Sequence, residues 1–396
     1  MRSIEILRKK LKEGFDFLHV RRQDALWRGV DGLMLGGRLW LTALGRDMRG
    51  PAQEKHRIKA ADRLLGNRAI HRARNQLYRA LAAWLLRETV RPVVLVDWTG
   101  CGRGQYVLRA GLPFLGRAIL LCACVVPKEK LANRAVHAAF LKTLATIIPQ
   151  GCTPVIVTDA GFHRRWFEQV RKLGWDFIGR IRGRFHVRAY GKKMPLKELF
   201  RTAGASPIDL GVTEVGANRA DLRRLVLSAR PQLKGRKRLT RRGKPGQRQV
   251  DHQRSSGAKD PLLLATSLDC HAKDVVEIYT TRMQIEESFR DLKSHRFGWS
   301  FSDAKSRDPR RLEVLLIIAT LASVAMSMVG VAAERRNLQR QFQANTLRKR
   351  RVLSLINLGR RVIHASIEFS AHELRAALAA VQAALRAANP LQDAPL

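Results

Sequence analysis

The chain has 396 residues, and its 74 lysines and arginines outnumber its 33 aspartates and glutamates, which gives a net charge of +41. Self-repulsion at such a charge destabilises a compact protein, so a polyanion is the expected partner, and nucleic acid is the obvious one. The five cysteines form no CxxC pair, which argues against a zinc site, and no secretory start precedes them. Reduced thiols in the cytoplasm, beside the nucleoid, fit this pattern. A basic structural or ribosome-associated protein is the alternative.

The length predicts two or three domains, and the first of them is helical. Apolar residues recur at helical spacing through residues 1–90, and the stretch 55–67 (KHRIKAADRLLGN) indicates a helix that ends near Gly66. Pro92 then breaks the pattern. We expect residues 1–90 to form a DNA-end-binding domain. The alternative is a helical extension that only packs on the core.

From residue 92 the sequence alternates between strands and helices. The expected order is strand, strand, strand, helix, strand, helix, strand, at 92–98, 104–111, 116–126, 131–148, 154–158, 162–173 and 175–181. This is the opening order of a ribonuclease-H-like domain, which we place at 91–303. Asp97 lies on the first strand and Asp159 ends the fourth, which is next to the first in that layout. The two carboxylates are therefore expected to be neighbours in space.

Residues 182–260 interrupt this α/β core with a β-rich, basic insertion. Short strands are expected near 184–190, 209–215 and 223–229. Residues 231–259 carry ten Lys or Arg and one acid, Asp251, among Gly, Pro, Gln and Ser. Such a loop is expected to order on a phosphate backbone, and a merely solvated loop is the alternative. A strand resumes at 261–268.

One helix, expected at 272–294, carries the most informative pattern. Tyr279, Arg282, Glu286 and Lys293 follow one another at spacings of three, four and seven residues. On an α-helix these steps place all four within about 60° of one another. A carboxylate thus shares a stripe with two cations and a phenol. We expect Arg282 and Lys293 to hold DNA phosphates, with Tyr279 donating a hydrogen bond to another.

Three carboxylates brought together make a plausible site for divalent metal. Asp97 is expected to bridge two Mg²⁺ ions, with Asp159 and Glu286 each completing one; Mn²⁺ is an acceptable substitute. Hard cations prefer carboxylate oxygens. Two such ions, about 3.5–4 Å apart, can activate water and stabilise the leaving oxygen of a phosphodiester.

The part of the chain from 304 to 396 is expected to be helical. Residues 314–333 are an uncharged run of 20, long enough for a membrane span, with arginines on both sides. Because these flanks show no positive-inside asymmetry, a buried helix at 312–333 is favoured and no membrane is expected. Ala- and Leu-rich helices near the C-terminus are candidates for dimerisation or other interactions.

The spacing of Tyr279, Arg282, Glu286 and Lys293 resembles the signature of the insertion-sequence-four family of cut-and-paste transposases. The segments VDWT, TDAGF, YTTRMQIEESFRDLKS and KHRIKAADRLLGN resemble blocks of the same family. The resemblance covers about 54 to 300. It implies a catalytic Asp, Asp and Glu set on a ribonuclease-H-like fold with a β-rich insertion, and a homodimer when synapsed on DNA.

The function implied is that of a DNA transposase, which binds the terminal inverted repeats of its element, cuts them with Mg²⁺ and joins the 3′ ends to target DNA. A ribonuclease-H-like nuclease that cuts without joining is one alternative. A DNA-binding protein derived from a transposase is another, and the intact carboxylate set argues against it.

Overall fold

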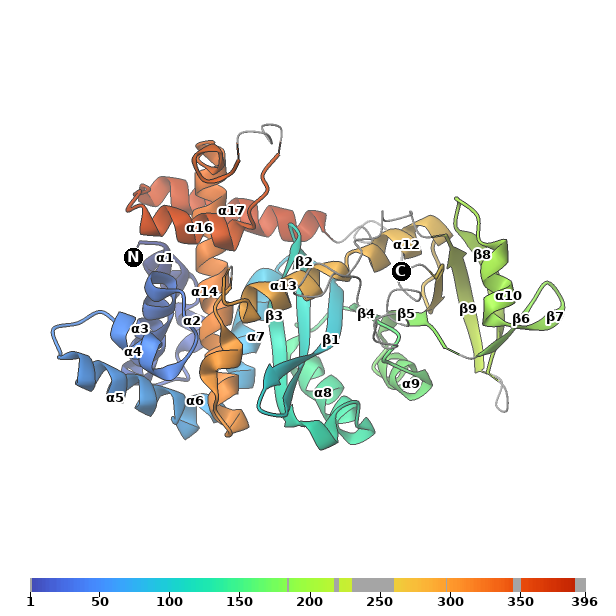
Figure 1. Ribbon diagram of the computed structural model, residues 1–396, viewed down its shortest axis with the longest axis horizontal. Coiled ribbons are helices and arrows are strands. Elements are labelled where there is room, and N and C mark those ends of the chain that lie inside the picture. Colours follow the sequence, from blue (N-terminus) through green and yellow to red (C-terminus); the bar gives the residue numbers. More distant parts are fainter. Residues whose placement is uncertain are drawn as a thin grey trace, which may run out of the picture. The chain divides into compact units, whose positions relative to one another are not determined.

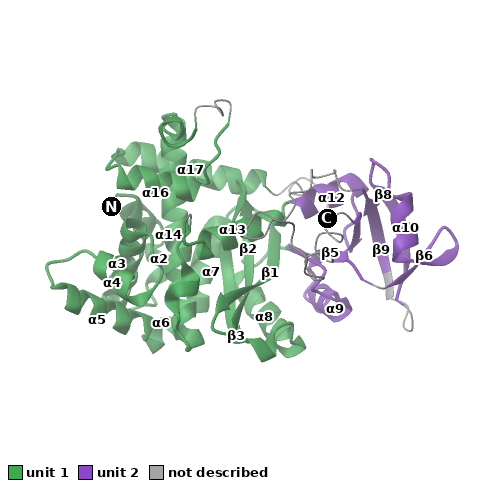
Figure 2. Ribbon diagram, viewed as in Figure 1, with its two compact units in different colours: residues 1–154, 281–396 green, residues 155–280 purple. Residues whose placement is uncertain are grey.

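The computed structural model describes residues 2–183, 185–216, 221–229, 260–296, 298–344 and 350–388. The protein is mixed α/β, as predicted, and divides into two compact units (Figures 1 and 2). Unit 1 combines residues 1–154 with 281–396, and unit 2 is residues 155–280. The three-part division expected from the sequence stays a prediction, as does the DNA-end-binding role of residues 1–90. The basic loop 231–259 lies outside the described residues.

The N-terminal region is helical, as the apolar spacing indicates. Its helices are α1 (Arg2–Lys10), α2 (Lys12–Phe15), α3 (Val20–Gly36), α4 (Leu41–Asp47), α5 (Glu54–Leu65), α6 (Arg68–Arg72) and α7 (Arg74–Leu85). The helix predicted to end near Gly66 is α5, whose C-cap is that glycine. Asn67 then caps α6, and its side chain accepts a hydrogen bond from the backbone N–H of Ile70 at 3.0 Å.

Three strands of unit 1 form an antiparallel meander. They are β1 (Val93–Gly102), β2 (Gln105–Phe114) and β3 (Arg117–Pro127), and Asp97 pairs with Arg109 across β1 and β2. The 3₁₀ turn η1 (Lys128–Lys130) and α8 (Arg134–Ile147) follow. α7 and α8 both pack on β3. The predicted strand order is confirmed, with ends displaced by a few residues.

Unit 2 holds the remaining strands and the insertion. β4 (Val155–Thr158) pairs in parallel with β5 (Asp176–Ile181), and α9 (Arg164–Lys172) connects them. The remaining elements are β6 (His186–Ala189), β7 (Lys192–Pro195), α10 (Leu196–Leu199), η2 (Phe200–Thr202), β8 (Ile208–Val215), β9 (Asp221–Ser228), β10 (Leu262–Thr266) and α12 (Ala272–Thr280). Within this unit the strand order is β4-β5-β10-β9-β8-β6-β7. The insertion at 182–260 is β-rich in its described part, as predicted.

The prediction of a single helix at 272–294 is wrong, because the chain forms two helices there. α12 ends at Thr280 and α13 (Met283–Lys293) begins after a turn at residues 281–282. Two consecutive β-branched threonines weaken the helix at this point, and the Thr280 hydroxyl bonds back to the Glu277 carbonyl at 2.6 Å. Tyr279 therefore belongs to a different helix, and a different unit, from Arg282, Glu286 and Lys293.

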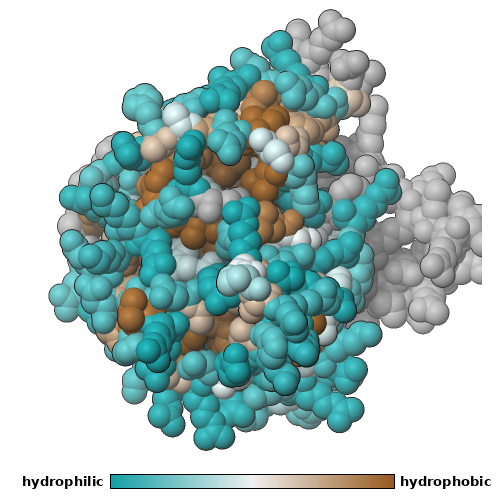
Figure 3. All heavy atoms as spheres, turned by 90° about the vertical axis from the view of Figure 1, so that its left-hand side faces the viewer, coloured by the Kyte–Doolittle hydropathy of each residue, from teal (hydrophilic) through white to brown (hydrophobic). Residues whose placement is uncertain are grey.

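The apolar segment predicted at 312–333 forms α14 (Pro309–Arg335), which follows η3 (Phe301–Ala304). By length and composition it could cross a membrane, but 94% of its apolar window is buried inside the protein. On the face of unit 1 shown in Figure 3, hydrophilic residues cover the rim and hydrophobic residues gather in the upper half. The burial of α14 fits a core helix. α15 (Gln339–Phe342), α16 (Leu355–His364) and α17 (Ala371–Ala387) complete the chain.

A buried carboxylate on α14 ties the N-terminal helices to the strands. Glu313, 7% exposed, lies 2.7 Å from Nε2 of His71 on α6 and 3.2 Å from Nε of Arg74 on α7. Its other oxygen accepts a hydrogen bond from the backbone N–H of Val125 on β3 at 3.0 Å. Glu313 thus connects three elements in the interior of unit 1.

Two glycines allow α14 and α16 to touch through their backbones. A Cβ atom on Gly330 would lie 2.2 Å from the carbonyl oxygen of Leu355, and one on Gly359 would lie 2.3 Å from that of Met326. Neither carbonyl can rotate away as a side chain would. The close approach of these helices therefore requires glycine at both positions.

We expect Gly359→Ala to destabilise the protein by about 1–2 kcal/mol, because overpacking outweighs the better helix propensity of alanine. Urea unfolding measures the change. Gly66→Ala is the control, since the nearest atoms to its added Cβ lie 3.4 Å away. Equal stability of Gly359→Ala and the unaltered protein would contradict the backbone contact.

Candidate active site

One stripe of α13 fixes this helix on the β2–β3 hairpin. Oε1 of Gln284 accepts hydrogen bonds from two backbone N–H groups of the hairpin, at 2.9 and 3.1 Å. The Ser288 hydroxyl accepts a third, at 2.5 Å. Asp291 forms an ion pair with Arg117 of the hairpin at 2.6 Å. Because these contacts are spaced along the helix, they fix both its rotation and its height above the strands. We call Gln284, Ser288 and Asp291 the anchoring stripe.

A second stripe of α13 meets the side chains of β1. Arg282 lies just before the helix, and its guanidinium donates to Oε1 of Glu286 at 2.6 Å and to Oδ2 of Asp97 at 3.4 Å. Further along the helix, Nζ of Lys293 donates to the Thr99 hydroxyl at 2.6 Å. Asp97 and Thr99 are two residues apart on a strand, so they share a face. The structure thus brings three residues of the expected stripe, Arg282, Glu286 and Lys293, to the face of β1 that carries Asp97.

The solvent exposure of the site residues increases from Asp97 and Arg282, which are buried, to Glu286, which is exposed. Asp97 is 9% exposed and Arg282 is 8% exposed, whereas the side chain of Glu286 is 43% exposed. The Asp97 carboxylate also accepts a hydrogen bond from the backbone N–H of Trp98 at 2.8 Å. A ligand can therefore reach Glu286 from solvent, while Asp97 is held in a fixed orientation below it.

Arg109 is a member of the site that the sequence analysis missed. It pairs with Asp97 across the strands, is 6% exposed, and its guanidinium lies 5.0 Å from the centre of the Phe289 ring on α13. Its Nε and Nη1 have no hydrogen-bond partner among the described residues. Burial lowers the pKa of Arg109 to about 10, so it stays charged at neutral pH. An arginine in an otherwise apolar strand was the available signal.

Lys293 is a half-buried cation at the end of this stripe. Burial is the main cause that lowers its pKa; neighbouring Arg109 lowers it further, while Cys101 and Asp97 act in the opposite direction. A phosphate beside the ammonium would favour its charged form. This end of α13 is therefore electrostatically suited to an anion.

Asp97 and Glu286 fit a metal cation by their geometry and chemistry. Two nitrogens of the Arg282 guanidinium contact the two carboxylates, so Asp97 and Glu286 face the same cation. Carboxylate oxygens are the ligands that Mg²⁺ prefers. Within the described residues of either unit, no three His, Cys, Asp or Glu side chains gather as a metal site would require. Unit 1 supplies two of the three predicted ligands.

The other two predicted site residues lie in unit 2. Asp159 directly follows β4, and its Oδ1 accepts a hydrogen bond from the Gly161 backbone N–H at 2.8 Å, which closes a turn. Tyr279 on α12 is 4% exposed. The expected proximity of Asp97 and Asp159 spans the two units, so it stays a prediction, as does the phosphate contact of Tyr279.

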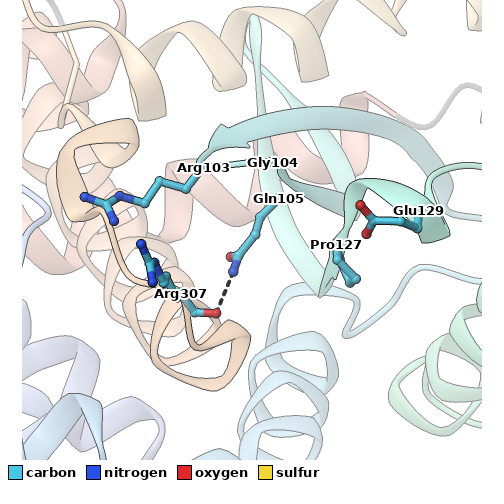
Figure 4. Close-up of a pocket in the computed structure, with 6 residues that line it drawn as sticks. All are labelled: Arg103, Gly104, Gln105, Pro127, Glu129 and Arg307. Carbon is cyan, nitrogen blue, oxygen red and sulfur yellow. Dashed lines mark hydrogen bonds between the residues drawn. The ribbon is translucent and has the colours of Figure 1, made fainter.

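A separate pocket of about 480 Å³ lies at the turn between β1 and β2 (Figure 4). The guanidinium groups of Arg103 and Arg307 lie on one side of it, and Glu129 lies on the other. Gln105 fixes the wall by donating to the backbone carbonyl of Arg307 at 2.7 Å. Because a carboxylate faces the two arginines, this pocket is less suited to a polyanion.

A family model described as "Transposase DDE domain" matches residues 88–324, more than half of the chain. The chain belongs to this transposase family. The matched segment of the transposase contains Asp97, Asp159 and both stripes of α13. No curated protein matched the sequence.

Among solved structures, the transposase is similar to the piggyBac transposase, in a structure described as a synaptic complex with hairpin DNA. The match has 10% identity and a TM-score of 0.39, and covers 92% of this chain and 76% of that chain. A similarity this low does not support an argument about fold or function.

We expect Arg282→Ala to tighten the binding of Mn²⁺ in the absence of DNA several-fold, because the guanidinium competes with the metal for Asp97 and Glu286. Titration followed by the electron paramagnetic resonance of free Mn²⁺ measures this. Arg290→Ala on the same helix is the control, since Arg290 is 64% exposed and pairs with Glu287 at 2.8 Å. Unchanged or weaker Mn²⁺ binding in Arg282→Ala would show that guanidinium and metal do not share the carboxylates.

Proposed function

We propose that this protein is a cut-and-paste DNA transposase of the insertion-sequence-four type. It binds the terminal inverted repeats of its element, cleaves the phosphodiester bonds, and joins the 3′ ends to target DNA. The observation that carries the proposal is one cluster within a transposase domain: Arg282 contacts Asp97 and Glu286, and Lys293 contacts Thr99 on the same face of β1. Their spacing, which resembles the signature of that type, gives the finer assignment its support.

The residues of the stripe divide the work by their chemistry. Asp97, Asp159 and Glu286 would hold two Mg²⁺ ions, or Mn²⁺ in their place, which when bound activate the attacking water and stabilise the leaving oxygen. Arg282 binds a phosphate next to the scissile bond through its planar fork of donors. Lys293, oriented by its hydrogen bond to Thr99, holds a second phosphate as a point charge.

The Arg282 guanidinium contacts both Asp97 and Glu286. A DNA phosphate offers the guanidinium a new anionic partner, so binding of DNA and release of Asp97 and Glu286 are coupled. Arg109 stays fixed below the site and adds positive charge that favours the bound phosphates. This arrangement prepares the carboxylates for their ligands only when substrate is present.

The proposal extends to fold and assembly. The order β1-β2-β3-α8-β4-α9-β5 supports a ribonuclease-H-like core, interrupted by the β-rich insertion before Glu286. The net charge of +41 supports DNA as the partner, for the element ends and for the target. We propose that the active form is a homodimer on DNA, in the cytoplasm beside the nucleoid. A nuclease that lacks strand transfer would yield cut ends but no joined products.

We expect Asp97→Asn, Asp159→Asn and Glu286→Gln each to reduce cleavage by about 10³-fold or more, while DNA binding is retained. The losses should not add in double variants, since the ligands act as a unit. The assay uses labelled ends identified from repeats that flank the gene, with Mg²⁺, and scores cut and joined products separately. Glu287→Gln is the control, because Glu287 pairs with Arg290 and points away from the stripe.

Full cleavage in any one of the three variants would remove that residue from the site. Cut ends without joined products, in the unaltered protein, would replace the transposase proposal with the nuclease alternative.

A further inference from the structure

A basic pocket of about 640 Å³ lies in unit 1, beyond the C-terminal end of α13. We call it the α16 pocket. The last residues of α3, the chain after α13 and the end of α16 line it. Its charged or titratable lining residues are Arg38, His295, Arg296, Arg360, Arg361 and His364. No acidic residue is among its lining residues, in contrast to the pocket of Figure 4.

Three of these arginines have no acidic partner in the described part of the chain. Arg38 lies 5.4 Å above the ring of Trp40, and Arg360 donates only to the backbone carbonyl of Gly298, at 3.4 Å. Arg361 is exposed at the last turn of α16. Cations gathered in one concave site without counter-charges repel one another. The pocket therefore has unused capacity to bind an anion.

Three carboxylates lie near the pocket, on Asp47, Asp291 and Asp303, and two of them form ion pairs with other residues. Asp291 has its ion pair with Arg117 at 2.6 Å, and Asp303 pairs with His295 at 3.0 Å. Burial is the main cause that raises the pKa of Asp47. The charges of Arg46 and Arg57, and to a smaller extent that of His364, lower it. These acids do not neutralise Arg38, Arg360 and Arg361.

Packing and a hydrogen bond fix the side chain of Arg360 in the pocket. Its stem passes against Gly37, where an added Cβ would lie 3.4 Å from Cδ, and the positive φ of 64° at Gly37 ends α3 at that point. Burial is the main cause that lowers the pKa of Arg360, and the charges of Arg361 and Arg38 lower it further, against a smaller opposing effect of Asp291. A bound anion would offset both causes.

We propose that the α16 pocket binds a backbone phosphate of DNA outside the active site. The proposal rests on the proposed function, because the same DNA must enter the active site. From Glu286 to the last residue of α13, Lys293, the helix rises about 10 Å, at about 1.5 Å per residue. The pocket lies beyond this end, so we expect its phosphate about three to four nucleotides along one strand. The forked donors of several arginines match the geometry of a phosphodiester. The pocket thus positions the duplex that the active site cuts.

The test measures how salt affects binding to a labelled duplex of arbitrary sequence. We expect Arg360→Gln and Arg361→Gln to weaken binding several-fold, and to make the slope of log K against log salt shallower by about 0.9 for each phosphate that the variant no longer neutralises. Arg360→Lys should keep the slope and bind with reduced affinity, because an ammonium lacks the fork. Arg375→Gln is the matched control, since Arg375 is exposed on α17 and has no ion pair among the described residues.

A second measurement distinguishes a missing phosphate interaction from a misfolded variant. Neutral methylphosphonates, placed one at a time in the duplex, should weaken binding of the unaltered protein at a position about three to four nucleotides from the cut site. The same substitution should have no further effect on Arg360→Gln. Equal effects in both proteins would overturn the assignment, as would an unchanged salt slope in Arg360→Gln and Arg361→Gln.

Inorganic phosphate is the probe that tests whether the pocket binds a small free anion instead of a DNA phosphate. If phosphate raises the melting temperature of the unaltered protein but not of Arg360→Gln, and DNA slopes are equal, the pocket binds a small anion and the DNA assignment is overturned. If the unaltered protein does not cleave DNA but the variants still show a shallower salt slope, the transposase proposal fails and the assignment of a DNA phosphate to the α16 pocket stands.

Discussion

The guanidinium of Arg282 is the interaction on which the candidate site depends. It neutralises carboxylates from two elements far apart in the sequence, Asp97 on β1 and Glu286 on α13. Two carboxylates that face each other without a cation repel, and the buried one, Asp97, carries an additional desolvation cost. A cation between them is therefore a condition for the site to exist. In the proposed function, a DNA phosphate and metal would take over the two roles that Arg282 combines, as the partner of the guanidinium and as the cation between the carboxylates.

The rest of unit 1 keeps the two carboxylates at this spacing. Asp97 is fixed by the strands, and α13 is fixed on the strands by the anchoring stripe. Behind the strands, Glu313 connects α14 to α6, α7 and β3. The glycine contacts between α14 and α16 then fix the position of α16, whose last turn carries Arg360 and Arg361. A single packed framework thus positions the active site and the α16 pocket.

Sequence patterns predicted the local features well, because each depends on a short stretch of chain. The strand order, the β-rich insertion and the buried helix follow from apolar periodicity and turn residues. The (i, i+4) pair of Arg282 and Glu286 follows from helical geometry. The break at residues 281–282 was missed because the apolar pattern continues through it, although two threonines mark it.

Features that depend on contacts between distant segments could not be read from the sequence. Arg109 is a basic residue in a strand until the register places it opposite Asp97. Arg38 and Arg360, more than 300 residues apart, meet only when α3 and α16 pack together. Asp97 and Asp159 belong to different compact units. Their proximity therefore follows neither from a motif nor from the packing within either unit.

The division of α13 into two stripes has a consequence for how mutational scans of this protein are interpreted. Gln284 and Ser288 contact the β2–β3 hairpin, and their side chains face neither Asp97 nor Thr99. Replacing either would rotate or lift the helix and displace Glu286 and Lys293 together. A scan scored by activity alone would therefore rank these amide and hydroxyl groups with the carboxylates, although their contribution is to alignment.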